Sequence, residues 1–140
     1  MFKSILVPVN LEDAQTVNSA METAIKLAQQ GGAKLHFLTV FPGFGMPLVG
    51  SFFPEGAEGE AMKQCSERLR QLVSDAVPAG IEVSTDVEEG NAWESILRYA
   101  EKRAVDLIVM PSRHRAQSLL GSVSARVAER AKCSVLITRV

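Results

Sequence analysis

The hydrophobic pattern of this chain alternates between short continuous apolar runs and longer stretches in which apolar residues recur every three or four positions. The continuous runs cover residues 4–9, 34–41, 82–87, 107–110 and 134–138. Runs of this length predict strands that are covered on both faces, as in a parallel sheet. The run at 82–87 is the most polar of these, so we expect that strand near an edge of the sheet.

The stretches between the runs predict helices, each with one apolar face. We expect Asp13 to cap the first helix and Gly31-Gly32 to end it. Asn91 is expected to cap the third helix, with Glu94 completing a capping box, and the fourth helix opens within residues 119–122. The apolar faces are formed by Val17, Met21, Ala24 and Ala28 in the first helix, by Met62, Cys65, Leu69, Leu72 and Ala76 in the second, and by Trp93, Ile96, Leu97 and Ala100 in the third.

The alternation of strands and helices predicts one α/β domain over residues 1–140, with a parallel sheet and helices on both faces. Crossovers in such a sheet are right-handed. Ligands then bind beyond the carboxyl ends of the strands, at the point where the strand order reverses. In a doubly wound sheet that point lies between the first and fourth strands, so the loops at 8–11 and 111–121 are the expected location of a site.

The second of these loops is basic and leads into a helix. The sequence Arg-His-Arg at 113–115 precedes Gly121-Ser122 at the expected helix start. A helix N-terminus presents unpaired N–H groups and the positive end of its dipole, so this segment suits a phosphate. The alternative is a solvated basic loop followed by an ordinary helix start. In the first loop, Asn10 either contacts a ligand or stabilises the turn after its strand.

The sequence shows no Ser/His/Asp or Cys/His constellation. His114 by itself does not indicate a general base, and His36 lies within a strand pattern where a structural role is expected. The pair Glu88-Glu89 lacks the His or Cys spacing of a metal site. We therefore expect neither a catalytic residue nor a metal.

The composition is that of an ordinary globular domain, with 46% hydrophobic residues, 22% charged residues and a formal net charge of −1. A nearly neutral chain has no general attraction to nucleic acid or to a membrane surface. The first residues lead directly into a strand, so we expect no signal peptide, and no run is long enough to span a bilayer. Cys65 and Cys133 lack disulfide or zinc spacing, and we expect two free thiols in the cytoplasm.

Several segments, in their order and spacing from end to end, resemble the universal stress protein family. They are Ile5–Val9, Val87–Gly90, Ala104–Val109, Leu119–Val123, Ala128–Ala131 and Cys133–Ile137. The resemblance implies the strand order 3-2-1-4-5, a role in stress resistance and a homodimer that pairs the last strands. The strand at 134–138 has no proline or central charge, as an edge that pairs with a second copy should. Many members of the family bind ATP, and some do not.

The family's nucleotide residues carry over in part. The acidic residue that usually follows the Pro-x pair is Asn10 here, and the backbone that contacts adenine would fall at Val40. In the family pattern Gly-x2-Gly-x9-Gly-Ser/Thr, Pro111 takes the first glycine position and His114 the second, and the loop that follows is shorter. Residues 112–115 look closer to a branch of the family with a Ser-His-Arg type loop. The nucleotide set implied by the resemblance is Pro8, Val9, Asn10, Val40, Met110, Ser112, Arg113, His114, Arg115, Gly121, Ser122 and Val123.

Three classes of function remain open. The first is a stress-response homodimer that binds ATP or AMP, with Mg if ATP, and signals to an unknown protein partner. The second is a dimeric interaction module of the same family that has lost nucleotide binding, which Pro111 and the short loop favour. The third is an adenylating enzyme of the ATP-pyrophosphatase type, which would need a glycine-rich loop where residues 10–13 supply none.

Residues 42–59 are predicted to form a Gly/Pro-rich loop, which is unusually apolar for a surface segment. Exposed apolar patches tend to mark contacts, so this loop is expected over the ligand cleft or against a partner chain. The alternative is a loop that packs on its own core.

Overall fold

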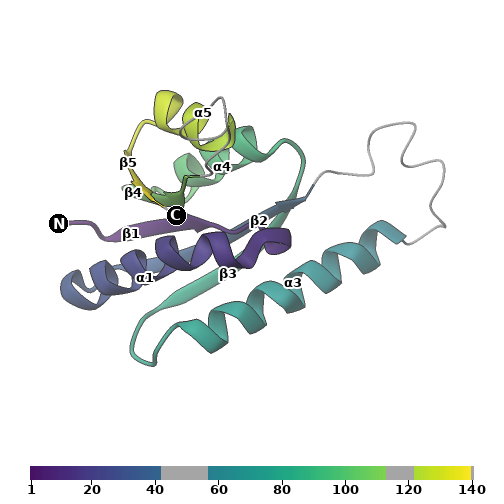
Figure 1. Ribbon diagram of the computed structural model, residues 1–140, viewed down its shortest axis with the longest axis horizontal. Coiled ribbons are helices and arrows are strands. Elements are labelled where there is room, and N and C mark those ends of the chain that lie inside the picture. Colours follow the sequence, from purple (N-terminus) through teal and green to yellow (C-terminus); the bar gives the residue numbers. More distant parts are fainter. Residues whose placement is uncertain (42–56, 113–121, 140) are drawn as a thin grey trace.

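The computed structural model describes residues 1–41, 57–112 and 122–139 (Figure 1). Along the chain, the elements are β1 (Ser4–Pro8), the 3-10 turn η1 (Leu11–Asp13), α1 (Ala14–Gly31), β2 (Lys34–Phe41), α3 (Ala57–Ala76), β3 (Val83–Glu89), α4 (Ala92–Lys102), β4 (Leu107–Pro111), α5 (Ser122–Arg130) and β5 (Ser134–Thr138).

The strands are parallel and lie in the order β3-β2-β1-β4-β5, which confirms the predicted order 3-2-1-4-5. Helices α1 and α3 cover one face of the sheet, and α4 and α5 cover the other (Figure 1). The strand order reverses between β1 and β4, as expected. β3 and β5 form the two edges of the sheet.

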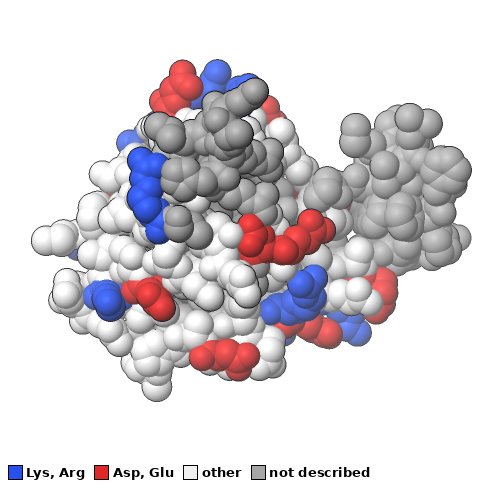
Figure 2. Space-filling model, viewed as in Figure 1, with Lys and Arg blue, Asp and Glu red and all other residues white. Residues whose placement is uncertain are grey.

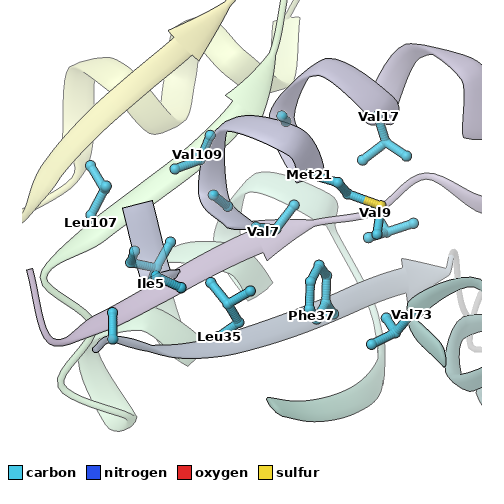
Figure 3. Close-up of a cluster of buried hydrophobic side chains, with 14 of the residues drawn as sticks. Ile5, Val7, Val9, Val17, Met21, Leu35, Phe37, Val73, Leu107 and Val109 are labelled. Carbon is cyan, nitrogen blue, oxygen red and sulfur yellow. The ribbon is translucent and has the colours of Figure 1, made fainter. Parts of the chain in front are cut away.

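Each face of the central strands buries its own hydrophobic core. In β1, Ile5 and Val7 pack with the residues of α1, and Leu6 between them packs with those of α4 and α5. Figure 3 shows Val17 and Met21 of α1 on the first of these cores. Because both faces are buried, the strand sequences are continuously apolar instead of alternating.

The predicted helix faces are largely confirmed. All the residues predicted for the apolar face of α1 are buried, as are Ile96 and Ala100 of α4. Ala76 is exposed, because α3 ends at this residue, and Val73 is buried one turn earlier. Tyr99, which was not predicted to be in the core, is also buried.

Two of the predicted helix ends are confirmed, and one is not. Gly32 follows α1 with a φ of 72°, the left-handed conformation that glycine adopts readily. Asn91 caps α4, where its Oδ1 accepts the N–H of Glu94 at 3.2 Å. Asp13 precedes α1, but its side chain makes no capping hydrogen bond, so that prediction was wrong. The chain first winds into η1, and it is Asn10 whose side chain stabilises this turn.

Two predicted boundaries are corrected. β3 extends to Glu89, two residues beyond its predicted end, because its last residues pair with Val40 and Phe41 of β2. α3 begins at Ala57, so the loop predicted over 42–59 is too long. Residues 42–56 lie outside the described structure, as does the predicted contact of this loop with a cleft or a partner.

A polar network crosses the sheet near the start of β1. The His36 ring is 4% exposed and contacts Ser84 Oγ through Nδ1 at 2.7 Å and Ser4 Oγ through Nε2 at 3.0 Å. It therefore links β1, β2 and β3. The Tyr99 ring lies edge-on to it, and the Tyr99 hydroxyl donates to Asp86 Oδ2 at 2.5 Å. His36 thus has the structural role expected of it.

The electrostatic surroundings of His36 favour its neutral form. Burial lowers the pKa of His36 below its usual 6.5, and the positive charges of Lys34 and Arg103 act in the same direction. The carboxylates of Asp86 and Glu82 oppose this shift in the pKa and do not reverse it. Burial, with the hydrogen bond to Asp86, raises the pKa of Tyr99 to about 12, so this phenol stays neutral.

We expect the free energy of unfolding to decrease as the pH falls below 6.5, the usual pKa of histidine. Above that pH His36 is neutral in both the folded and unfolded states and adds no pH dependence. Between that pH and the lower pKa of the folded state, the unfolded chain binds a proton that the folded protein excludes. Stability is then lost with a limiting slope of about 1.4 kcal/mol per pH unit. Urea unfolding at about pH 7.5 and about pH 5.5 measures the difference.

The control uses the other histidine of the chain, His114. His36→Gln should unfold at lower urea concentration near pH 7.5, because it loses at least one serine contact, and it should lack this part of the pH dependence. His114→Gln should keep the dependence. An unchanged pH dependence in His36→Gln would contradict the assignment to His36.

Candidate functional site

The carboxyl ends of β1, β2 and β4 open into a cavity of about 410 Å³. It lies at the reversal of the strand order, where we expected a site. Residues from α1 and α3 reach it from one face of the sheet, and residues from α4 and α5 reach it from the other. The cavity is therefore surrounded by elements that are far apart in the sequence.

Most of the predicted site residues that the structure describes line this cavity. They are Pro8, Val9, Asn10, Val40, Met110, Ser122 and Val123. Ser112 is not among the lining residues. It is fully buried, its N–H donates to Thr138 O at 2.8 Å, and its Oγ has no hydrogen-bond partner among the described residues. The other predicted residues, Arg113, His114, Arg115 and Gly121, lie outside the described structure.

Asn10 stabilises the turn after β1 and also faces the cavity. Its Oδ1 accepts the N–H of Glu12 at 3.0 Å, and its backbone carbonyl accepts the N–H of Asp13 at 3.0 Å. The residue is exposed and lines the cavity. Asn10 therefore stabilises the turn after β1, one of the two roles expected from the sequence. The same turn places its side-chain amide at the cavity.

Short hydrogen bonds between neighbouring elements hold the cavity walls. The Thr39 hydroxyl, only 3% exposed, donates to Val9 O at 2.8 Å, and Val9 N–H donates to Leu38 O at 2.7 Å. On the other side, Ser124 Oγ of α5 donates to Pro111 O at 2.9 Å. The two bonds of Val9 join the end of β1 to β2. The bond from Ser124 holds the start of α5 against the end of β4.

α3 contributes two lining residues that we did not predict as site residues, Cys65 and Arg68. Arg68 reaches across to the turn after β1, where its Nη2 donates to Leu11 O at 3.0 Å. The amphipathic pattern placed Cys65 on the inner face of α3 and contained no signal for Arg68. Arg68 reaches the cavity only because α3 packs against η1, and this packing cannot be inferred from the sequence of α3 alone.

The charges at the cavity are mixed. Glu12 and Asp13 line it as acids, and Arg68 is the basic lining residue within the described parts of the chain. The start of α5 adds the backbone N–H groups of its first turn, which face no partner within the helix. Over the surface seen in Figure 2, basic and acidic side chains are likewise interspersed.

Within residues 1–41, 57–112 and 122–139, no three His, Cys, Asp or Glu side chains gather in a way that could hold a metal ion. In the same ranges, no helix has the length and apolar character of a membrane span.

Comparison with known proteins places this chain in a family. The model of the Universal stress protein family matches residues 1–139. The chain belongs to the universal stress protein family. Among curated members, universal stress protein MJ0531 of Methanocaldococcus jannaschii is 30% identical, with 99% of this chain and 83% of that protein aligned. Universal stress protein YxiE of Bacillus subtilis is 29% identical, with 99% and 100% aligned.

The fold of this universal stress protein is shared with solved structures. Hypothetical protein MJ0577 superposes with a TM-score of 0.83 at 22% identity, covering 100% of this chain and 97% of the other. A universal stress protein in complex with cAMP gives a TM-score of 0.63 at 23% identity, covering 99% and 97%. The universal stress protein of Archaeoglobus fulgidus in complex with dAMP gives 0.63 at 17% identity, covering 97% and 97%. At these identities the likeness establishes the fold.

The hydrogen bond from Thr39 to Val9 O, which joins two walls of the cavity, can be tested by substitution. Thr39→Val keeps the side-chain shape but leaves the buried Val9 carbonyl without this donor. We expect the free energy of unfolding to fall by about 1–3 kcal/mol, the usual cost of a buried unsatisfied group. Thr23→Val is the control, because Thr23 donates to Ser19 O within its own helix and should change stability by less than about 0.5 kcal/mol. Urea unfolding of both variants decides, and equal effects would contradict the assigned role of Thr39.

Proposed function

We propose that this universal stress protein binds an adenine nucleotide in the cavity at the ends of β1, β2 and β4, and acts as a regulatory or protective stress-response protein. The observation that carries the proposal is that seven of the predicted nucleotide residues, from four separate parts of the chain, line one cavity. Two members of the same fold have been solved with cAMP and with dAMP, which supports an adenine nucleotide as the ligand class.

Each lining segment suits one part of such a ligand. The backbone at Val40, near the end of β2, offers an N–H and a carbonyl for the edge of an adenine ring. The Asn10 amide suits a ribose hydroxyl, because it both donates and accepts hydrogen bonds. The first turn of α5, from Ser122, suits the phosphates through its N–H groups and dipole. If ATP is the ligand, a Mg ion would accompany its phosphates.

We expect binding that is weaker than in members with the full glycine pattern. Pro111 lines the cavity at the first glycine position and has no backbone N–H to offer a phosphate. The loss of one donor to a charged group costs about 1.5–3 kcal/mol, or roughly a tenfold to a hundredfold in affinity. We propose no hydrolysis at enzymatic rates, because the described lining contains no histidine, and among the described residues no three His, Cys, Asp or Glu side chains gather to hold a metal ion.

The second candidate is a dimeric interaction module that has lost nucleotide binding. Pro111 and the mixed charge of the cavity favour it, since Glu12 and Asp13 repel an anionic ligand. Calorimetry and thermal shift with ATP, ADP and AMP at millimolar concentration separate the two candidates.

Cys65 can report whether a nucleotide occupies the cavity. In Cys133→Ser, alkylation can occur only at Cys65, which lines the cavity. AMP at ten times its dissociation constant should slow iodoacetamide alkylation about tenfold, if a bound nucleotide covers the thiol. In Cys65→Ser, the reaction is restricted to Cys133, whose pKa is raised by burial, and AMP should leave its rate unchanged. No protection of Cys65, together with no heat of binding for any nucleotide, would favour the interaction module.

We also propose that the protein is a homodimer that pairs the β5 strands of two copies. β5 is an edge strand, and no strand in the described part of the chain pairs with its outer side. Pairing with a symmetry-related copy would satisfy the backbone groups on that side and extend the sheet across the dimer.

Light scattering at micromolar concentration should give twice the mass of one chain. Leu136→Pro, in the middle of β5, should give the mass of one chain, because proline cannot donate within a strand and distorts the edge. Val83→Pro, at the first residue of the other edge strand, is the matched control and should stay dimeric. A wild-type mass of one chain, or a dimer that survives in a folded Leu136→Pro, would contradict the proposal.

A further inference from the structure

Arg68 brings a positive charge to a cavity at which the other charged lining residues among those described, Glu12 and Asp13, are acidic. The residue lies on α3, and its hydrogen bond to Leu11 O places its guanidinium next to η1. Glu12 and Asp13 line the same region. An anionic ligand that enters there meets two carboxylates and one guanidinium, and the guanidinium is the charge that attracts it.

The hydrogen bond to Leu11 O fixes where this charge lies. Nη2 of Arg68 donates to that carbonyl at 3.0 Å, and Leu11 follows Asn10 directly in the turn after β1. A guanidinium carries several N–H donors in one plane, so it can hold a backbone carbonyl and a second acceptor at the same time. The bond to this carbonyl restricts the position of the guanidinium beside η1, which reduces the entropy that a ligand contact would otherwise cost.

α3 approaches the cavity along one face of the helix. Cys65 and Arg68 are one turn apart and both line the cavity, while Leu69 and Val73 on the adjoining side are buried in the core. The apolar residues thus hold α3 in place against the core, and this fixes the backbone position of Arg68 beside the cavity. Arg70, two positions further on, instead bonds to Ser66 of its own helix and does not line the cavity.

We infer that Arg68 binds the phosphate of the nucleotide and makes the cavity prefer a nucleotide over the uncharged nucleoside. The inference rests on the proposed function, because it assigns a residue to the same ligand. The chemistry is that of a guanidinium with a phosphate, a charge-assisted and often two-point hydrogen bond. The sequence pattern did not predict a phosphate contact from α3, and the contact proposed for the first turn of α5 comes from a different helix.

The test compares AMP with adenosine, which differ by the phosphate alone. Calorimetry on the full chain should show wild-type protein binding AMP at least about tenfold more tightly than adenosine. Arg68→Gln should weaken AMP roughly tenfold to a hundredfold and adenosine less than about threefold, so that the preference is largely lost. Arg68→Lys should recover part of the preference, because it restores the charge without the planar fork. Arg70→Gln is the matched control and should behave as wild type.

The outcomes separate this inference from the proposed function. If wild-type protein binds neither AMP nor adenosine, the proposed function fails and this inference fails with it. If wild-type protein prefers AMP and Arg68→Gln keeps that preference, the assignment of Arg68 alone is overturned. An equal loss of AMP and adenosine binding in Arg68→Gln would also overturn it, since that result describes a residue that shapes the wall or stacks on the base.

A dependence on salt gives a second readout that a structural role would not produce. The preference of wild-type protein for AMP should decrease as sodium chloride is raised, because the contact is partly exposed to solvent and is screened. In Arg68→Gln the remaining preference should change little with salt. A salt dependence that is the same in both proteins would contradict a phosphate contact by Arg68.

Discussion

The handedness of the crossovers is the constraint on which the cavity depends. From β1 the chain moves to α1 and then to β2 on one side, and from β4 it moves to α5 and then to β5 on the other side. With right-handed crossovers, steps in opposite directions along the sheet place their helices on opposite faces. The two connections therefore separate as they leave β1 and β4, and residues of both helices line the space between them. The cavity is the space that results.

The strands and the position of the site could be predicted from the sequence because both depend on local signals. Continuous apolar runs mark strands buried on two faces, and the strand order follows from the resemblance to the family. The end of β3 could not be predicted in this way, since Glu88 and Glu89 are held in the strand by pairing with Val40 and Phe41. The cap of α1 failed for a related reason. A single turn intervenes between β1 and the helix, and it takes Asn10 as its stabilising residue in place of Asp13.

The candidate site was predicted only as far as it is built from segments next to the ends of the central strands. Val9, Asn10, Met110 and Ser122 are such residues, and they line the cavity. Arg68 belongs to a helix whose sequence shows only an exposed, charged position, and its role depends on how α3 packs against the turn after β1. Sequence periodicity tells which face of a helix is buried. It does not tell which exposed residue at the margin of that face reaches a neighbouring cavity.

The anchoring of α5 has a consequence for how this family can diverge. Ser124 holds the start of the helix to the carbonyl of Pro111, Ser112 N–H bonds to Thr138 O, and Arg126 and Arg130 lie over the Trp93 ring of α4 at 5.3 Å and 5.2 Å from its centroid. None of these contacts uses residues 113–121. Insertions and deletions in that segment can therefore accumulate while the helix start keeps its place at the cavity. The segment between β4 and α5 can therefore change separately from the residues at the ends of β1 and β2, so the length of that segment is by itself a poor guide to whether the cavity has been kept.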